Sequence, residues 1–381
     1  MHAIRPVAKR YAWGSLTRLQ SLFRSDPSLS GVRGPLAEAW FSAHPVWPSP
    51  LETPTDGTMT LPDLIRSNPQ RMMGPRDSAR FGPVLPFLLK VIAARIPLSL
   101  QVHPAGFLAR EGFNREEALG VPRDSPNRSF PDPVEKNEMV LAIDRFDLSS
   151  GFAPVPRILG TLALVDHPLA RLMRGAMVGH SEASRTSGGL PGHPESARRV
   201  PQGRALETVL TGSRDPAGIP LALARARGRA RSGYDSLVLD HALLAATAFP
   251  GDAAVMALLL MDPVRLEPGE CAYIPAGTLH TYLRGAAVEI MTNSDTVLRA
   301  GMTVKPRHAG QVLDCVGVSS RMPWDSGPST DGTGLVVASG GASVRVMDPA
   351  IPEFLLILGE LPLADTGTAT IRVTGRGPRI M

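Results

Sequence analysis

Three residues have the types and the spacing of metal ligands. Gln101 and His103 stand two positions apart in a segment where apolar and polar residues alternate. Residues i and i+2 of a β-strand point to the same face, so both side chains can reach one ion. His280 follows Gly and Pro turn residues and begins another alternating stretch. Imidazole nitrogens and an amide oxygen suit zinc and leave open positions for water or a substrate.

A carboxylate would complete this ligand set, and the segment around EMVLAI (138–143) offers two. Glu135 and Glu138 are both candidates, and their spacing does not choose between them. The chain has only two cysteines, Cys271 and Cys315, so a Cys-rich zinc site is excluded and a disulfide framework is not expected.

Lysine is rare in this chain, which uses arginine for nearly all of its positive charge. The four lysines are Lys9, Lys90, Lys136 and Lys305. A lysine ammonium is compact and its pKa falls on burial, so each of these residues is a candidate for a specific role.

Two strands must position the ligands. Over 96–103, Ile96, Leu98, Leu100 and Val102 share one face, and Ser99, Gln101 and His103 share the other. Pro97 marks the start of this strand or an edge position. One apolar and one polar face suit the wall of a barrel with a polar interior. The segment 138–143 predicts a second short strand.

The rest of the chain predicts helices followed by more strands. Residues 155–180 and 220–248 are typical of helices, and 181–204, rich in Ser, Gly, Pro and Arg, predicts a loop. Strand character returns over 254–310, with an apolar run at 255–261, a turn at 267–270 and two short strands in HTYLRGAAVEIMTNS. Four short β runs follow from about residue 335.

Composition narrows the class of protein. With 381 residues, 43% of them apolar, the chain can form two or three domains with a sizeable core. It has no apolar run of about 18 residues, and its start lacks a signal-peptide pattern, so we expect no membrane partner and a cytoplasmic location. The net charge of +5 reflects an Arg-rich stretch at 171–231. No aromatic residues interleave with those arginines, which favours a solvated surface over nucleic-acid binding.

One motif resembles the second motif of the cupin superfamily: Gly269, Pro275, Gly277 and His280 in the pattern G-x5-P-x-G-x2-H. Gln101-Val102-His103 stands where the first cupin motif has paired histidines. The resemblance implies a mainly β protein with an α insertion. We expect a cupin-type jelly-roll domain over 1–150 and 250–310, a helical insertion domain over 151–249, and a shortened C-terminal β domain over 311–381.

Longer stretches carry a more specific resemblance. They are YAWGS (11–15), LAEAWFSAHP (36–45), LPFLLKVIAARIPLSLQVHP (85–104), NRSFPDPVEKNEM (127–139) and PAGTLHTYLRGAAVEIMTNSDTVLRAGMTVKP (275–306). In these stretches the chain resembles the type I mannose-6-phosphate isomerases, and they occur in the family's order. The resemblance implies one Zn²⁺ per chain, held by Gln101, His103, Glu138 and His280. It therefore selects Glu138 as the carboxylate ligand.

The resemblance also implies the reaction, which interconverts mannose 6-phosphate and fructose 6-phosphate through an enediol. The expected partner is thus a small sugar phosphate, and we expect a monomer. Arg299 falls on the family's catalytic arginine, and it or Lys305 would neutralise the enediolate or hold the phosphate. Lys136 and Glu289 are both candidates for the acid or base. Further substrate-contact candidates are Ser99, Tyr282 and Trp13. Tyr282 has the same parity as His280, so it should share the inward face of that strand.

Two departures from the family keep other functions open. DPVEKNE (132–138) replaces the usual DxNHKPE, so Glu135 adds a carboxylate that can compete for the metal. The chain also stops where the family normally continues, which predicts an exposed sheet edge in the C-terminal domain. The alternative is a non-catalytic metal- or sugar-binding cupin. A metal-dependent oxygenase is a second alternative, but it usually needs a His-rich iron site, and Gln101 argues against it.

Overall fold

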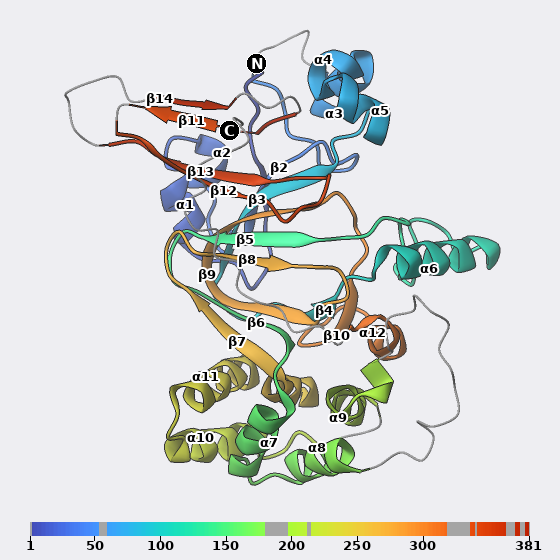
Figure 1. The fold of residues 1–381 in the computed structure, drawn as a ribbon, viewed down its shortest axis with the longest axis vertical. Coiled ribbons are helices and arrows are strands. Elements are labelled where there is room, and N and C mark those ends of the chain that lie inside the picture. The colour runs from blue at the N-terminus through green and yellow to red at the C-terminus, as the bar shows by residue number, and fades with distance from the viewer. Residues whose placement is uncertain are drawn as a thin grey trace.

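One long strand, β9 (His280–Thr292), belongs to two sheets (Figure 1). Its first part pairs with β4 (Leu100–Val102) and β6 (Phe146–Phe152), and its second part with β3 (Phe87–Ala94) and β5 (Glu138–Ala142). Gly285 lies between the two parts with φ of 110°. A Cβ there would lie 2.4 Å from the carbonyl oxygen of Arg145, so only glycine fits. The prediction of two short strands in this segment was therefore wrong.

The computed structural model describes residues 2–52, 59–179, 197–211, 215–317, 336–339, 341–362, 370–373 and 378–380. All the strand pairs of the main sheets are antiparallel. The strands not yet named are β1 (Val7–Lys9), β2 (Glu38–Phe41) and β8 (Cys271–Ile274) on the β3 side, and β7 (Met261–Leu266) and β10 (Leu298–Gly301) on the β4 and β6 side. Side chains from both sides form one buried apolar cluster between the sheets.

Two strand predictions need correction. The strand expected from Ile96 begins only at Leu100, since Pro97 has no N–H for a ladder. The apolar run at 255–261 is mostly a 3₁₀ helix, Ala253–Leu260, and β7 starts at Met261. This helix is buried along nearly its whole length, and a uniformly apolar run does not distinguish a helix from a strand. The strand predicted at 138–143 is confirmed as β5.

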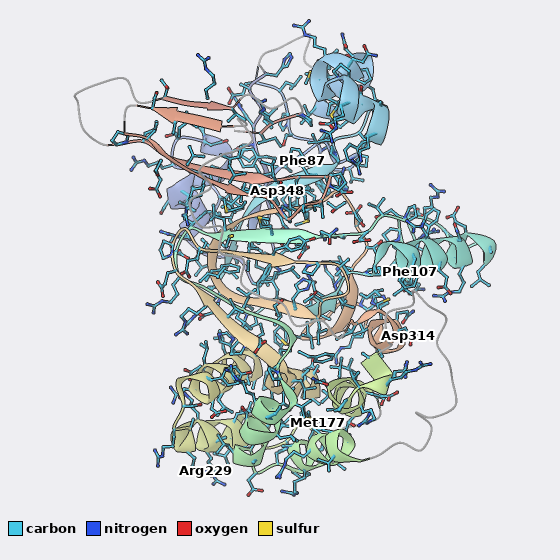
Figure 2. The ribbon with its side chains drawn as sticks, viewed as in Figure 1. Phe87, Phe107, Met177, Arg229, Asp314 and Asp348 are labelled. Atoms are coloured by element: carbon cyan, nitrogen blue, oxygen red, sulfur yellow. The ribbon has the colours of Figure 1, made fainter. Side chains whose placement is uncertain are left out.

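A layer of helices covers the β6 and β7 side of the sheets (Figure 1). It consists of α7 (Val155–Leu164), α8 (Pro168–Val178), α9 (Pro201–Leu210), α10 (Ile219–Arg229) and α11 (Gly233–Ala248). Figure 2 shows Met177 inside this layer and Arg229 at its outer end. Residues 181–196 of the predicted loop lie outside the described residues. The rest of that segment is helical from Ala197, so the loop prediction was wrong there.

The remaining helices lie around the sheets. They are α1 (Arg18–Leu22), α2 (Pro27–Ser30), α3 (Leu61–Ser67), α4 (Pro69–Met73), α5 (Pro75–Phe81), α6 (Gly106–Ala118) and α12 (Ala309–Cys315). Within the described ranges, no helix has the length and apolar character needed to cross a membrane.

The four β runs predicted near the C-terminus are confirmed as two antiparallel strand pairs. β11 (Val336–Ser339) pairs with β14 (Thr370–Val373), and β12 (Ser343–Met347) pairs with β13 (Leu356–Glu360). Met347 and Phe354 pack in a cluster with Phe87 of β3, so these strands rest on the outer side of the first sheet. Figure 2 shows Phe87 and Asp348 in this region.

Candidate metal centre and active site

His103, Glu138 and His280 meet between the two sheets. They come from the end of β4, the start of β5 and the start of β9, and their ligand atoms all lie within 4.8 Å of one another. Each side chain is at most 2% exposed. Nε2 of His103 lies 3.0 Å from Oε1 of Glu138, and Nε2 of His280 lies 3.2 Å from Oε2. Two imidazoles and a carboxylate are thus buried around one point.

The other ring nitrogens fix the tautomers. Nδ1 of His103 lies 2.8 Å from the carbonyl oxygen of Thr296, and Nδ1 of His280 lies 2.9 Å from that of Thr278. A carbonyl only accepts, so each Nδ1 carries the hydrogen and each Nε2 presents a lone pair. Among the described residues, Nε2 of His103 is buried beside the Glu138 carboxylate and has no other polar partner. This pattern of a backbone-anchored imidazole with a free nitrogen is typical of a metal ligand.

Gln101 borders the cluster but presents its amide nitrogen. Its Nε2 lies 3.2 Å from Nε2 of His280, and its Oε1 accepts from the Ser99 hydroxyl at 3.0 Å. Only the oxygen of an amide can bind a cation. A half-turn of the amide would bring Oε1 to the cluster, and the Ser99 hydroxyl would then accept from the amide nitrogen. Ser99 therefore orients Gln101.

The charges around the cluster favour the forms that bind metal. Burial, together with the charge of Lys136, lowers the pKa of His103 to about 4. Burial opposes ionisation of Glu138, but His103 and Lys136 hold the pKa of this carboxyl well below its usual range. Nζ of Lys136 lies 3.2 Å from Oε1 of Glu138. At neutral pH the carboxylate is ionised and the His103 imidazole is neutral, as coordination requires.

Glu135, the other carboxylate in this segment, points elsewhere. Its Oε2 accepts from the backbone N–H of Gly106 at 2.9 Å, at the start of α6, and its Oε1 accepts from Asn137 at 3.3 Å. A carboxylate at a helix N-terminus satisfies a free N–H and favours the helix dipole. Glu135 thus anchors α6, and Glu138 is the carboxylate that lies between the two histidines.

A row of hydrogen-bonded and ion-paired side chains extends from Glu138 across the sheet. The Tyr282 hydroxyl lies 3.2 Å from Oε2 of Glu138 and 3.0 Å from Oε1 of Glu289. Nζ of Lys90 lies 2.8 Å from Glu289 and 3.1 Å from Glu38. Burial lowers the pKa of Lys90, but Glu289 and Glu38 outweigh it and raise the pKa above its ordinary value. The cation therefore stays protonated between two acids.

Arg299 and Lys305 lie at the edge of this region. Arg299 of β10 is paired with Gln101 of β4 in the sheet, and burial lowers the pKa of its guanidinium. Its backbone exchanges two hydrogen bonds with His308, at 2.8 Å and 3.2 Å. Lys305 is exposed, with Nζ 5.3 Å from the centre of the Tyr11 ring. Trp13 stacks on Tyr11 at 5.6 Å, so this pair forms one aromatic wall beside Lys305.

Sequence reasoning missed several contacts here. The pairing of Asp295 with His44, 3.0 Å apart, was not predicted. The bridging of Glu138 and Glu289 by Tyr282 also went unpredicted, although the shared parity of His280 and Tyr282 placed the ring on the correct face.

Comparison with known proteins gives a consistent family. Residues 1–155 match the family model described as the catalytic domain of type I phosphomannose isomerase. Mannose-6-phosphate isomerase of Salmonella typhimurium is 31% identical over 361 residues, which cover 94% of this chain and 83% of the relative. The Escherichia coli enzyme is 33% identical over 300 residues, which cover 78% of this chain and 70% of the relative.

Solved structures agree with this result. The Salmonella typhimurium enzyme "bound to substrate (f6p)and metal atom (zn)" matches with a TM-score of 0.71 and 28% identity, covering 91% of this chain and 83% of that one. A structure described as mannose 6-phosphate isomerase "(holo; zinc bound)" matches with the same TM-score and coverage. With a relative above 30% identity over most of its length, the chain belongs to the type I mannose-6-phosphate isomerase family.

Proposed function

We propose that this protein is a zinc-dependent aldose–ketose isomerase that interconverts mannose 6-phosphate and fructose 6-phosphate. The observation that carries the proposal is the convergence of two backbone-anchored imidazoles on the buried carboxylate of Glu138. Membership of the isomerase family supplies the substrate. Gln101, His103, Glu138 and His280 would hold one zinc ion. When bound, zinc would supply a Lewis acid that polarises a sugar oxygen and orients the substrate.

The chain's own residues would move the proton and balance the charge. The reaction transfers a proton between adjacent sugar carbons through an enediol, so it needs an acid or base that can reach the substrate. Lys136, 3.2 Å from Glu138, is the group we propose for this role. Arg299 would neutralise the enediolate oxygen, and Lys305 would bind the phosphate.

The contacts of Glu289 favour a positioning role over the role of acid or base expected from the sequence. Its carboxylate already faces Lys90 and Tyr282, and burial raises its pKa. A group engaged on both sides is poorly placed to take a proton from a substrate carbon. We therefore propose Glu289 as a positioning residue that acts on Glu138 through Tyr282. Ser99 would likewise act through Gln101, and Trp13 through Tyr11.

The alternative of a non-catalytic metal- or sugar-binding protein is not favoured. The two sheets joined by β9 support the cupin-type jelly-roll assignment for 1–150 and 250–310, with 151–249 as the helical insertion and 311–381 as the C-terminal β domain.

We also propose a monomer located in the cytoplasm. Light scattering on the eluted protein would test the first of these, since a dimer would double the measured mass.

A coupled assay tests the activity. We expect the zinc-loaded protein to convert mannose 6-phosphate to fructose 6-phosphate, to lose activity with a chelator, and to recover it when zinc is restored. His280→Ala should lose both bound zinc and turnover, while its fold is checked by circular dichroism. If the folded, zinc-loaded wild-type protein showed no turnover, the isomerase proposal would fail and the non-catalytic alternative would remain.

A further inference from the structure

Lys9 lies on the face of the first sheet that carries the site. Directly paired residues of antiparallel strands share a face, as do residues two apart on one strand. Lys9 pairs with Glu38, Trp40 pairs with Lys90, and Lys90 pairs with Glu289. The Lys9 side chain therefore points to the same side as Glu289, into the space between the sheets.

Two indole rings surround the Lys9 ammonium. Its Nζ lies 3.4 Å from the centre of the Trp47 ring and 4.9 Å from that of Trp40. Trp40 is also 5.9 Å from Nζ of Lys90 and donates to Glu38 at 2.8 Å. The Trp40 side chain thus contacts Lys9 and also the Lys90–Glu38 pair that leads to Glu138. Trp47 is 46% exposed and Lys9 only 8%, so the indole covers the cation at the edge of the site.

Lys9 differs from the other two buried lysines in lacking a carboxylate partner. Lys90 lies between Glu38 and Glu289, and Lys136 contacts Glu138. Across the described ranges, Lys9 forms no ion pair with a carboxylate. Burying an unpaired ammonium is costly, and contacts with aromatic faces return only about 0.5–2 kcal/mol each. A buried cation of this kind is completed by an anion from outside the chain.

Within the described residues, Arg299 and Lys305 are two further cations that lack a carboxylate partner, and they lie near Lys9. Neither forms an ion pair with a carboxylate in the described part of the chain. Burial is the main cause that lowers the pKa of Lys9; Glu38 opposes the shift, and the charge of Lys305 adds to it. Lys305 lies at the exposed edge, where desolvation of its ammonium and then the charge of Arg299 lower its pKa. Lys305 thus repels both Lys9 and Arg299, and three neighbouring cations without an ion-pair partner among the described residues suit a dianionic ligand group.

We infer that Lys9 is a specificity-determining residue, which binds the phosphate of the sugar substrate together with Lys305 and Arg299. The inference rests on the proposed function and deepens it. Trp40 and Trp47 would hold the ammonium extended toward the phosphate and keep water from it. The favoured ligand is then a phosphorylated sugar, and a neutral sugar of the same shape would gain nothing from Lys9.

Substitution of Lys9 tests this directly. Lys9→Met keeps the length of the side chain and removes the charge, and Lys9→Arg keeps a cation. The matched control is Arg10→Met, which removes the exposed neighbouring cation that donates to the carbonyl oxygen of Arg33. For each protein we would measure kcat and KM for mannose 6-phosphate, zinc content, and the inhibition constants of sorbitol 6-phosphate and of neutral sorbitol.

For Lys9→Met we expect KM and the inhibition constant of sorbitol 6-phosphate to rise about tenfold or more, since a charge-assisted contact is lost. The inhibition constant of sorbitol, the zinc content and kcat should change less than about twofold. Lys9→Arg should recover most of the loss, and Arg10→Met should behave as wild type. Unchanged constants for both inhibitors, or equal increases in both, would overturn the inference. An inactive wild-type protein would instead count against the proposed function.

Discussion

Nζ of Lys90 lies 2.8 Å from Oε2 of Glu289, and the two side chains are 12% and 2% exposed. Glu38 contacts the same ammonium from the other side at 3.1 Å. One cation therefore compensates two buried carboxylates. One of them, Glu289, is linked through the Tyr282 hydroxyl to Glu138.

Lys90→Met should destabilise the protein strongly. It leaves two buried carboxylates without their cation, and breaking a buried ion pair costs about 3–5 kcal/mol. The pKa of Glu289 is already raised by burial, so this carboxyl can take up a proton when Lys90 is gone. The loss in free energy of unfolding should therefore be smaller at pH 5.5 than at pH 8. Urea titrations at both pH values measure it, and a loss that is equal at both would contradict this account.

Glu138→Gln and Glu135→Gln should behave oppositely toward zinc. Glu138 lies between the two histidines, whereas Glu135 caps α6. The first variant should lose bound zinc. The second should retain about one zinc per chain and lose about 0.5–2 kcal/mol of stability with the helix cap. Metal analysis after dialysis, with a thermal melt, separates them. Zinc retained by Glu138→Gln and lost by Glu135→Gln would reverse the assignment.

Tyr282→Phe should weaken zinc binding without removing it. The ring still fills its place next to Phe146, 5.4 Å away, while the hydroxyl between Glu138 and Glu289 is lost. Removing an outer partner of a metal ligand typically costs about 10–100-fold in affinity. Competition with a chromogenic chelator measures the change. An affinity equal to that of wild type would mean that the hydroxyl does not orient Glu138.

His241 should make stability depend on pH. Burial lowers the pKa of this imidazole, although Asp147, 3.8 Å away, opposes the shift. The unfolded chain then binds the proton more readily, so stability is full above the unfolded pKa of about 6.5 and falls as the pH drops below it. His241→Gln should make the free energy of unfolding fall less between pH 7.5 and 5.5 than it does in the wild-type protein. Parallel slopes in urea titrations of the two proteins would refute this.

Gly285→Ala should destabilise the protein by more than about 1 kcal/mol, because its Cβ would meet the Arg145 carbonyl at a positive φ. Gly228→Ala is the matched control: it lies in α10, and nothing is within 4 Å of its added Cβ. That variant should be neutral or stabilised by about 0.4–1 kcal/mol. Equal melting temperatures for the two variants would show that β9 tolerates a side chain at its bend.

Local pattern predicted much of what surrounds the site, and its failures have physical causes. Alternation placed Gln101 and His103 on one face, and parity placed Tyr282 beside His280. The sequence could not show whether 255–261 forms a helix or a strand, because a buried 3₁₀ helix and a buried strand are equally apolar. The bend of β9 requires the positive φ of Gly285. In the sequence, a glycine at this position indicates only an ordinary turn. The role of Glu135 depends on the N-terminus of α6, 29 residues away in sequence.

The pairing of β9 with four other strands has a consequence for the slowest motions of the protein. An amide in the middle of β9 donates its hydrogen to a neighbouring strand within the sheets, so it exchanges with solvent only when that strand separates from β9. His280, Tyr282 and Glu289 all stand on this strand. Hydrogen exchange there should report global opening, and His280, which we propose as a zinc ligand, should stay in place through every smaller fluctuation. Release of the metal and loss of the fold would then share one transition.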